Sequence, residues 1–174
     1  RPYPSLDFAL VGEPDLTIRD LLDHLEGKIG ERSPQITQMF TKHDATYRPS
    51  LNGDGTVNMH GIKGIAWRKG EEILLNFPRS FVADLDDMPI PMHELLPLQS
   101  YRMPLIKGPF TFIVTSRGCP AGCTYCIKHV SYQYATRLRS PKLIMEELWY
   151  LKKLGINNIH MYADLFTVNK GQVV

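Results

Sequence analysis

Cysteine is scarce in this sequence: only three of its 174 residues are cysteines, and all three fall between positions 119 and 126. An odd number of cysteines in one short stretch is a poor disulfide framework for a small fold. A cluster of this kind is more typical of a metal or cofactor site in a reducing compartment. We therefore expect a cytoplasmic protein whose cysteines have a chemical role.

The sequence also lacks a long apolar run and a strong excess of charge of either sign. No stretch of about 18 apolar residues is present, so no membrane span is expected, and the N-terminus shows no signal-peptide core. The 20 Lys and Arg residues nearly balance the 18 Asp and Glu residues, which gives a net charge of +2. This balance gives no reason to expect nucleic acid as a partner.

The first 27 residues follow the pattern of a strand, a turn and a helix. An apolar strand at 8–11 precedes a Gly-Glu-Pro-Asp turn at 12–15. Thr17 and Asp20 predict a capping box at the start of a helix, and Gly27 is placed to end it. The apolar side of this helix would contain residues at i, i+3, i+4 and i+7, namely Ile18, Leu21, Leu22 and Leu25. We interpret this stretch as the end of a doubly wound α/β domain.

The middle of the chain predicts an irregular insertion, a hairpin and a linker. Residues 28–60 are polar and irregular, and apolar stretches at 62–67 and 72–77 flank a turn, as in a β-hairpin. Residues 78–109 hold six of the thirteen prolines, which remove backbone donors and block regular structure. We therefore divide the chain into the end of a first domain with its hairpin (1–77), a linker (78–109) and the start of a second domain (110–174).

The second domain begins with a strand–helix–strand pattern. A strand is expected at 110–115 and another at 156–162. Between them, Ser140 can cap a helix with Pro141 at its first position, and Gly155 is placed to end it. A unit of this length indicates two parallel strands joined by a right-handed crossover.

All three cysteines lie on the loop that follows the first of these strands. Cys119, Cys123 and Cys126 have the spacing C-x3-C-x2-C, with an aromatic residue before the last. Three thiolates can hold three irons of a four-iron cluster and leave the fourth iron open to a small molecule. A structural zinc site is the alternative, and His129 would then supply the fourth ligand.

The C-x3-C-x-aromatic-C pattern resembles the signature of the radical S-adenosylmethionine (SAM) superfamily. The resemblance implies that Cys119, Cys123 and Cys126 bind a [4Fe-4S] cluster whose open iron binds SAM. It also implies that Tyr125 lies beside the adenine of SAM through its backbone. Asp164, at the end of the second strand, would contact the SAM amino group, although it stands in Tyr-Ala-Asp-Leu-Phe rather than Gly-Gly-Glu. The alternative is that Asp164 caps a loop.

The order of segments along the whole chain resembles the cobalamin-binding class of radical SAM enzymes. The resemblance implies a fold that comprises the end of a doubly wound cobalamin-binding domain, a Pro-rich linker and the start of a radical SAM β/α barrel. Gly12 and Glu13 would then lie at the carboxyl edge of the cobalamin-binding sheet, where ligands bind in such folds. A plain strand-to-helix turn is the alternative for these two residues. No D-x-H-x-x-G cobalt-ligating motif is present.

Residues 115–173 most resemble the anaerobic magnesium-protoporphyrin IX monomethyl ester oxidative cyclases. The resemblance rests on Thr115 to His129, Arg137 to Pro141 and His160 to Thr167. It implies an oxidoreductase of bacteriochlorophyll biosynthesis with a porphyrin-type substrate and a reductant protein such as flavodoxin or ferredoxin. A cobalamin-dependent radical SAM methyltransferase and a non-catalytic metal module are the alternatives. His129, Arg137, Arg139 and His160 are candidates for contacting cofactor or substrate, or for structural roles.

We also expect the sequence to be a fragment of a longer protein, because it lacks an initiator methionine and stops soon after a predicted strand. A barrel of this type takes about 200 residues or more, and far fewer follow Cys119. We therefore expect the fragment to be poorly stable and catalytically incompetent in isolation.

Overall fold

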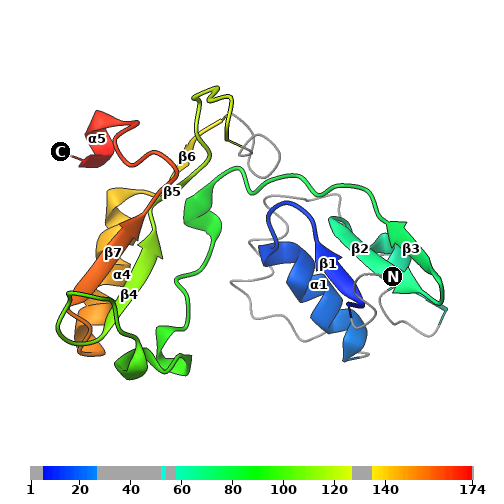
Figure 1. The fold of residues 1–174 in the computed structure, drawn as a ribbon, viewed down its shortest axis with the longest axis horizontal. Helices are drawn as coiled ribbons and strands as arrows, with labels where there is room; N and C mark the ends of the chain where they lie inside the picture. The colour runs from blue at the N-terminus through cyan, green and yellow to red at the C-terminus, as the bar shows by residue number, and fades with distance from the viewer. Residues whose placement is uncertain (1–5, 27–51, 54–57, 127–134, 174) are drawn as a thin grey trace. The chain divides into compact units, whose positions relative to one another are not determined.

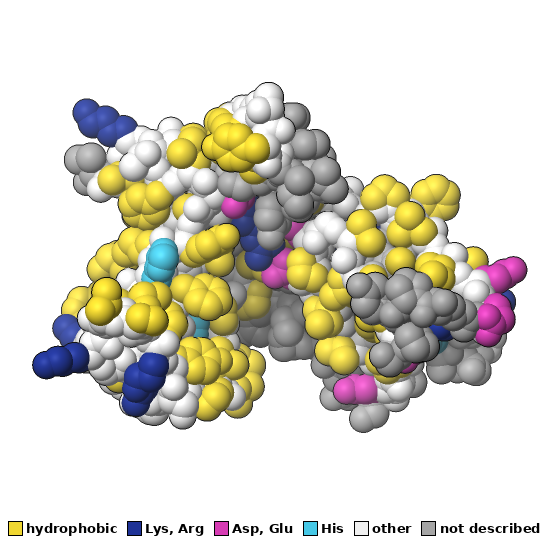
Figure 2. Space-filling view, viewed as in Figure 1, with side chains coloured by type: hydrophobic (Ala, Val, Ile, Leu, Met, Phe, Trp, Pro, Cys, Tyr) yellow, Lys and Arg dark blue, Asp and Glu magenta, His cyan; other side chains and the backbone are white. Residues whose placement is uncertain are grey.

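The computed structural model describes residues 6–26, 52–53, 58–126 and 135–173. The chain forms two compact units, the first ending at Val82 and the second beginning at Ala83 (Figure 1). Hydrophobic side chains are exposed on both units in the view of Figure 2. None of the helices in the described part of the chain has the length and hydropathy that a membrane crossing requires.

The described residues of the first unit form a three-stranded antiparallel sheet and one α-helix. Strands β1 (Phe8–Leu10), β2 (Ile65–Lys69) and β3 (Glu72–Leu75) lie in that order, and the helix is α1 (Asp15–Leu25). The predicted hairpin is confirmed as β2 and β3. The sequence analysis did not predict that β1 would join it, with Phe8 opposite Trp67. The core of this unit contains Leu21, Met59, Ile62 and Ile65.

The capping box predicted at Thr17 and Asp20 is wrong. Helix α1 begins two residues earlier, at Asp15, and its N-cap residue Pro14 makes no side-chain cap bond. Thr17 is instead fully buried, and its hydroxyl donates to the Lys63 carbonyl at 3.0 Å. Asp20 is also buried and forms an ion pair with Arg79. Both polar side chains therefore bind the helix to the segments on either side of the hairpin rather than cap it.

The buried side of α1 also differs from the predicted apolar side. Its buried residues are Leu16, Thr17, Asp20 and Leu21. Of the four residues predicted for the apolar side, only Leu21 is buried, and Ile18, Leu22 and Leu25 are exposed. The polar partners of Thr17 and Asp20 explain the difference, because buried polar groups are tolerated where their hydrogen bonds are made.

The Pro-rich stretch after the hairpin contains only short 3-10 turns among its regular elements. These are η2 (Leu85–Asp87), η3 (His93–Leu95) and η4 (Leu98–Ser100), after η1 (Met59–Gly61) in the first unit. The stretch is nevertheless packed: Leu98 belongs to the core of the second unit, and an Asp86 carboxylate oxygen accepts the Ser140 N–H at 2.7 Å. The limits 1–77, 78–109 and 110–174 remain a prediction.

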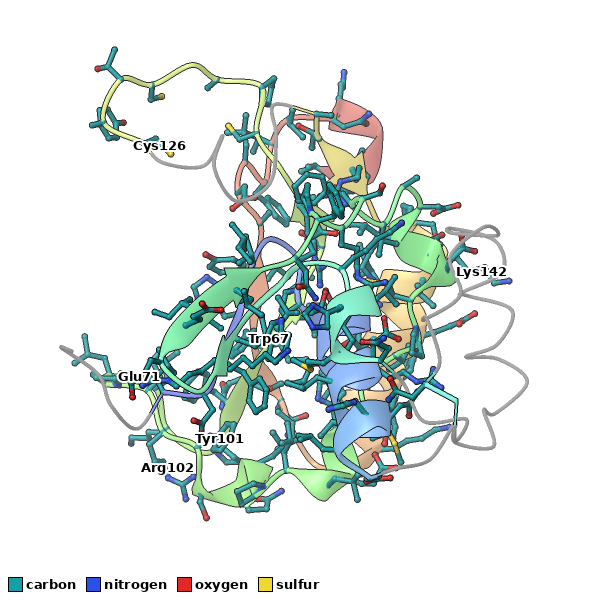
Figure 3. The ribbon with its side chains drawn as sticks, turned by 90° about the vertical axis from the view of Figure 1, so that its right-hand side faces the viewer. Trp67, Glu71, Tyr101, Arg102, Cys126 and Lys142 are labelled. Atoms are coloured by element: carbon teal, nitrogen blue, oxygen red, sulfur yellow. The ribbon has the colours of Figure 1, made fainter. Side chains whose placement is uncertain are left out.

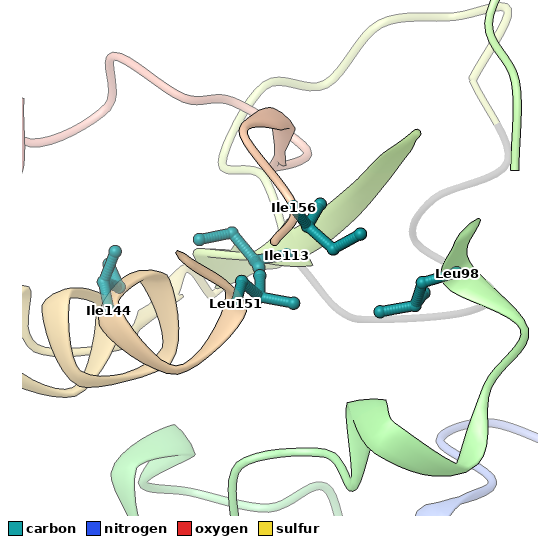
Figure 4. Packing of buried hydrophobic residues seen from close by; sticks show 5 residues of the cluster. All are labelled: Leu98, Ile113, Ile144, Leu151 and Ile156. Atoms are coloured by element: carbon teal, nitrogen blue, oxygen red, sulfur yellow. The ribbon is translucent and has the colours of Figure 1, made fainter. Parts of the chain in front are cut away.

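The second unit is built on the predicted strand–helix–strand pattern. Strands β4 (Phe110–Val114) and β7 (Asn158–Tyr162) are parallel, and α4 (Pro141–Lys153) connects them. Ser140 caps α4 as predicted, because its Oγ accepts the Leu143 N–H at 3.2 Å. The core, drawn in Figure 4, comprises Leu98, Ile113, Ile144, Leu151 and Ile156. The described part of the unit also contains two short strands, β5 (Ser116–Arg117) and β6 (Arg137–Leu138), and the helix α5 (Lys170–Val173).

Candidate functional site

The cysteine loop leaves the carboxyl end of β4, as the sequence predicts. Directly after β4, strands β5 and β6 pair in antiparallel fashion, with Ser116 opposite Leu138 and Arg117 opposite Arg137. This ribbon closes the base of the loop. In Figure 1 the ribbon and the loop lie beyond the carboxyl ends of β4 and β7, which is where β/α folds place their active sites.

Gly118, immediately before Cys119, lies where the two ends of the loop approach each other closely. Its φ angle of +89° lies in the left-handed region, and a Cβ atom there would lie 2.1 Å from the Ala135 carbonyl oxygen. Only glycine fits this position. The buried Gly118 N–H donates to the Oδ2 atom of Asp164 at 2.7 Å. Asp164 therefore makes the loop-capping contact that was one of its two predicted roles.

The chain on either side of the ribbon is fixed through Thr115. The Thr115 carbonyl accepts the Arg139 N–H at 3.0 Å and the Gln172 side-chain amide at 2.9 Å. The same Gln172 amide donates to the Arg139 carbonyl at 3.1 Å. The Thr115 N–H donates to the Tyr162 carbonyl at 2.9 Å. The two chain segments that enter and leave the loop are thus held together and to β7.

A buried group of ionisable side chains lies next to the base of the loop. Glu147 of α4, only 1% exposed, places Oε2 at 2.5 Å from an Arg139 guanidinium nitrogen and Oε1 at 2.8 Å from His93 Nε2. The same Arg139 nitrogen donates to the Val114 carbonyl at 2.9 Å. Arg139, a candidate for contacting cofactor or substrate, therefore bridges the end of β4 to α4.

The three thiols lie on the loop itself and are not paired in disulfides. Cys119 and Cys126 are partly buried, and Cys123 is exposed. The Cys126 N–H donates to the Cys123 carbonyl at 3.1 Å, which forms a turn between them. Figure 3 shows Cys126 on a stretch that extends away from the rest of its unit. Within the described ranges, no group of three or more His, Cys, Asp or Glu side chains is arranged to hold a metal ion.

The chemistry of this donor set nevertheless fits an iron–sulfur cluster. The loop supplies three free thiols within eight residues, and thiolates are the usual protein ligands of such clusters. The base of the loop is fixed on both sides, while Tyr125, next to Cys126, is 89% exposed. His129, the predicted fourth ligand of a zinc site, lies outside the described residues.

The remaining candidates are in separate places. Glu13 is 5% exposed, and its Oε2 accepts the Val82 N–H at 3.1 Å, so its carboxylate is used within the first unit. Gly12 has a φ of +83° and open space where a side chain would stand. His160 is exposed on β7, opposite Phe112 of β4. Arg137 lies in β6 and is partly buried.

Sequence reasoning missed several residues that build the base of the loop. Gln172 carries no sequence signal, because its partners Thr115 and Arg139 are 57 and 33 residues away. Glu147 is buried against Arg139 and against His93, and no local pattern indicates the second contact because His93 lies 54 residues away. Gly118 was the most recognisable of them, since it directly precedes the first cysteine.

Known proteins are similar to this chain along its whole length, although no protein-family model matches it. An uncharacterized methyltransferase of Pyrococcus horikoshii is 27% identical across 100% of the chain and 32% of its own length. Cytidylyl-2-hydroxyethylphosphonate methyltransferase of Streptomyces wedmorensis is 26% identical across 94% of the chain and 31% of its own length. The anaerobic magnesium-protoporphyrin IX monomethyl ester cyclase of a Synechocystis species is 26% identical across 96% of the chain and 28% of its own length. The chain spans about a third of the length of these relatives.

Two solved structures of TsrM from Kitasatospora setae, a radical SAM methyltransferase, share the fold. Each matches 98% of the chain with a TM-score of 0.56 and 13% identity, and the chain covers 28% and 29% of the two structures. The chain has the fold of one part of this enzyme. The predicted fold class is thereby confirmed. One TsrM structure contains cobalamin and a [4Fe-4S] cluster, and the other contains tryptophan and a SAM analogue.

Proposed function

We propose that the complete protein is a radical SAM methyltransferase that uses cobalamin, and that this chain supplies the loop for its iron–sulfur cluster. The observation that carries the proposal is the C-x3-C-x2-C loop of free thiols, fixed at the carboxyl end of β4. The proposal is supported by the similarity of the whole chain to a methyltransferase of Pyrococcus horikoshii. It is further supported by the fold that the chain shares with TsrM.

In this proposal Cys119, Cys123 and Cys126 hold a [4Fe-4S] cluster. When bound, the cluster offers one open iron to SAM and supplies the electron that cleaves SAM. The chain's own contribution is to present three thiolates from a loop whose two ends are held by β-pairing and by Gln172. Tyr125, exposed beside Cys126, can offer its backbone to the adenine of SAM.

The first unit would contribute to the cobalamin site. Gly12 is free of neighbours where a side chain would stand, so a ligand can approach its backbone closely. The Glu13 carboxylate accepts the Val82 N–H, so we assign it the role of shaping the turn that presents Gly12. A reductant protein such as flavodoxin or ferredoxin and a cytoplasmic location remain part of the proposal.

The oxidative cyclase is the second candidate, and a porphyrin-type substrate would then apply. It is supported by the similarity to the Synechocystis cyclase at 26% identity. Support for a methyltransferase is broader, because two of the three relatives described above and the structural neighbour carry that name. We therefore place the methyltransferase first, with a small-molecule substrate whose identity is open.

The first test is anaerobic reconstitution of the full-length protein with iron and sulfide. We expect a reduced four-iron signal in electron paramagnetic resonance, and a shift of this signal when SAM is added. A protein that takes up zinc in place of iron, or that binds no cluster, would contradict both enzymatic candidates.

The second test separates the two candidates by their products. SAM with an isotopically labelled methyl group is supplied together with cobalamin and reductant. A methyltransferase converts SAM to S-adenosylhomocysteine and moves the label to an acceptor. A cyclase incubated with magnesium-protoporphyrin IX monomethyl ester forms an unlabelled cyclised product, and this result would replace our first candidate with the second.

A further inference from the structure

Asp164 lies two residues after the end of β7 and contacts the start of the cysteine loop. Its Oδ2 accepts the N–H of Gly118, the residue directly before Cys119, at 2.7 Å. We infer that Asp164 is a positioning residue, which fixes the start of the cysteine loop by accepting this hydrogen bond. The inference rests on the proposed function, because it concerns how the chain holds the three cluster ligands.

The backbone at Gly118 requires an acceptor. Gly118 is buried, and a buried N–H without a partner is strongly disfavoured. The close approach of Gly118 to the Ala135 carbonyl, together with its φ of +89°, fixes the peptide in one orientation. The Asp164 side chain meets the N–H in that orientation. Losing the acceptor would therefore favour a different backbone path into Cys119.

The other contacts at the base of the loop do not replace this one. The Gln172 and Arg139 contacts hold Thr115, three residues before Gly118. The β5–β6 pairing ends at Arg117 and Arg137. Beyond Gly118 the described loop residues are exposed or partly buried. Among the contacts described above, the bond to Asp164 is thus the one nearest the first cysteine, and it joins the loop to the segment after β7.

The role we infer needs an acceptor atom and not a negative charge. An amide oxygen accepts an N–H as a carboxylate oxygen does, although more weakly. A carboxylate that contacts the amino group of SAM, in contrast, would affect the response to SAM and not the retention of iron. Asn and Ala substitutions at position 164 therefore separate the two roles, because Asn retains an acceptor and Ala retains neither.

The experiment compares iron retention in the full-length protein with Asp164→Asn and Asp164→Ala variants, all reconstituted anaerobically. The measurements are the rate of iron release to a chelator and the electron paramagnetic resonance signal with and without SAM. We expect Asp164→Asn to behave as the wild type in both. We expect Asp164→Ala to release iron about tenfold faster, a typical loss for groups that orient metal ligands.

Two glycine variants provide an independent test and a matched control. Gly118→Ala would place a Cβ 2.1 Å from the Ala135 carbonyl oxygen, so it should release iron as fast as Asp164→Ala does. Gly122→Ala lies on the same loop with nothing within 4 Å of its Cβ, so it should retain iron as the wild type does. Circular dichroism of each variant verifies that the fold is intact.

Three outcomes would overturn the inference while leaving the proposed function intact. The first is an Asp164→Ala variant that retains iron as the wild type does. The second is an Asp164→Asn variant that loses iron as fast as Asp164→Ala. The third is a Gly118→Ala variant that retains iron as the wild type does, because the backbone at Gly118 would then not need this orientation. A wild-type protein that takes up no cluster would instead contradict the proposed function.

Discussion

Glu147 and His93 meet in the interior of the second unit, with 2.8 Å between Glu147 Oε1 and His93 Nε2, across 54 residues of sequence. The other Glu147 oxygen lies 2.5 Å from the Arg139 guanidinium. Removing the carboxylate would leave a buried guanidinium without its counter-ion. We expect Glu147→Ala to lower the free energy of unfolding by about 3–5 kcal/mol, as when one member of a buried ion pair is deleted. Urea unfolding of the full-length protein measures the change.

The adjacent residue is a matched control for that experiment. Glu146 occupies the neighbouring position of α4, but its side chain is 52% exposed, and its Lys142 partner is more exposed still. Exposed ion pairs contribute little, so Glu146→Ala should change stability by about 0.5 kcal/mol or less. Equal effects of the two substitutions would show that burial of Glu147 is unimportant.

The hydroxyl of Thr17 supports the first unit through two bonds. It donates to the Lys63 carbonyl and accepts from Arg79 Nε, each at 3.0 Å. Thr17→Val conserves shape but removes both of these hydrogen bonds, which should cost about 1–3 kcal/mol. Thr17→Ser retains the hydroxyl and should cost less, about 0.8 kcal/mol for the lost methyl group. A larger loss for Ser than for Val in thermal unfolding would mean that the methyl group matters more than the hydroxyl.

Gly64 allows three segments of the first unit to approach closely. Its φ is +73°, and a Cβ there would lie 3.0 Å from Thr17 Oγ1 and 3.1 Å from the Val11 carbonyl oxygen. Gly70 has a similar φ of +60° but nothing within 4 Å. Both Gly→Ala changes incur about 1–2 kcal/mol for the left-handed backbone, and Gly64→Ala should cost more because of the contacts. Chemical denaturation of the two variants tests the difference, and equal costs would refute it.

The three cysteines should differ in reactivity before iron is added. Cys123 is exposed, whereas Cys119 and Cys126 are partly buried. Because alkylation requires access to the thiolate, we expect Cys123 to react first with iodoacetamide in the iron-free protein. Mass spectrometry of peptides after short reaction times measures the order. The unfolded protein serves as the control, and all three thiols should become protected after reconstitution.

The parts of the fold that were predicted correctly depend on local signals. Ser140 and Pro141 mark the start of α4, and their roles require only neighbours within one helical turn. The sheet of the first unit was not predicted in full, because the pairing of Phe8 with Trp67 leaves no local pattern. The polar residues Thr17 and Asp20 misled the prediction, since a helix-capping pattern and a buried polar contact use the same residue types.

In the candidate site, too, the features with a local sequence signal could be predicted and the long-range contacts could not. The spacing of Cys119, Cys123 and Cys126 predicts the proposed cluster ligands directly from the sequence. The base of the loop could not be predicted, because Asp164 and Gln172 reach their partners across 46 and 57 residues. Such contacts depend on the register of β4 and β7, and the sequence predicts the parallel pairing of these strands but not their register.

The parallel register of β4 and β7 determines where the cysteine loop begins. Val114 lies opposite Tyr162. Just beyond this pair, Thr115 bonds to Tyr162 and Gly118 bonds to Asp164. A residue inserted near Gly122, in the exposed part of the loop, would leave both of these contacts unchanged. A residue inserted between Tyr162 and Asp164 would move the Asp164 carboxylate away from Gly118 while Tyr162 stays bonded to Thr115. The exposed part of the loop can therefore vary in length, while contacts with the segment that follows β7 fix the position of its first residue.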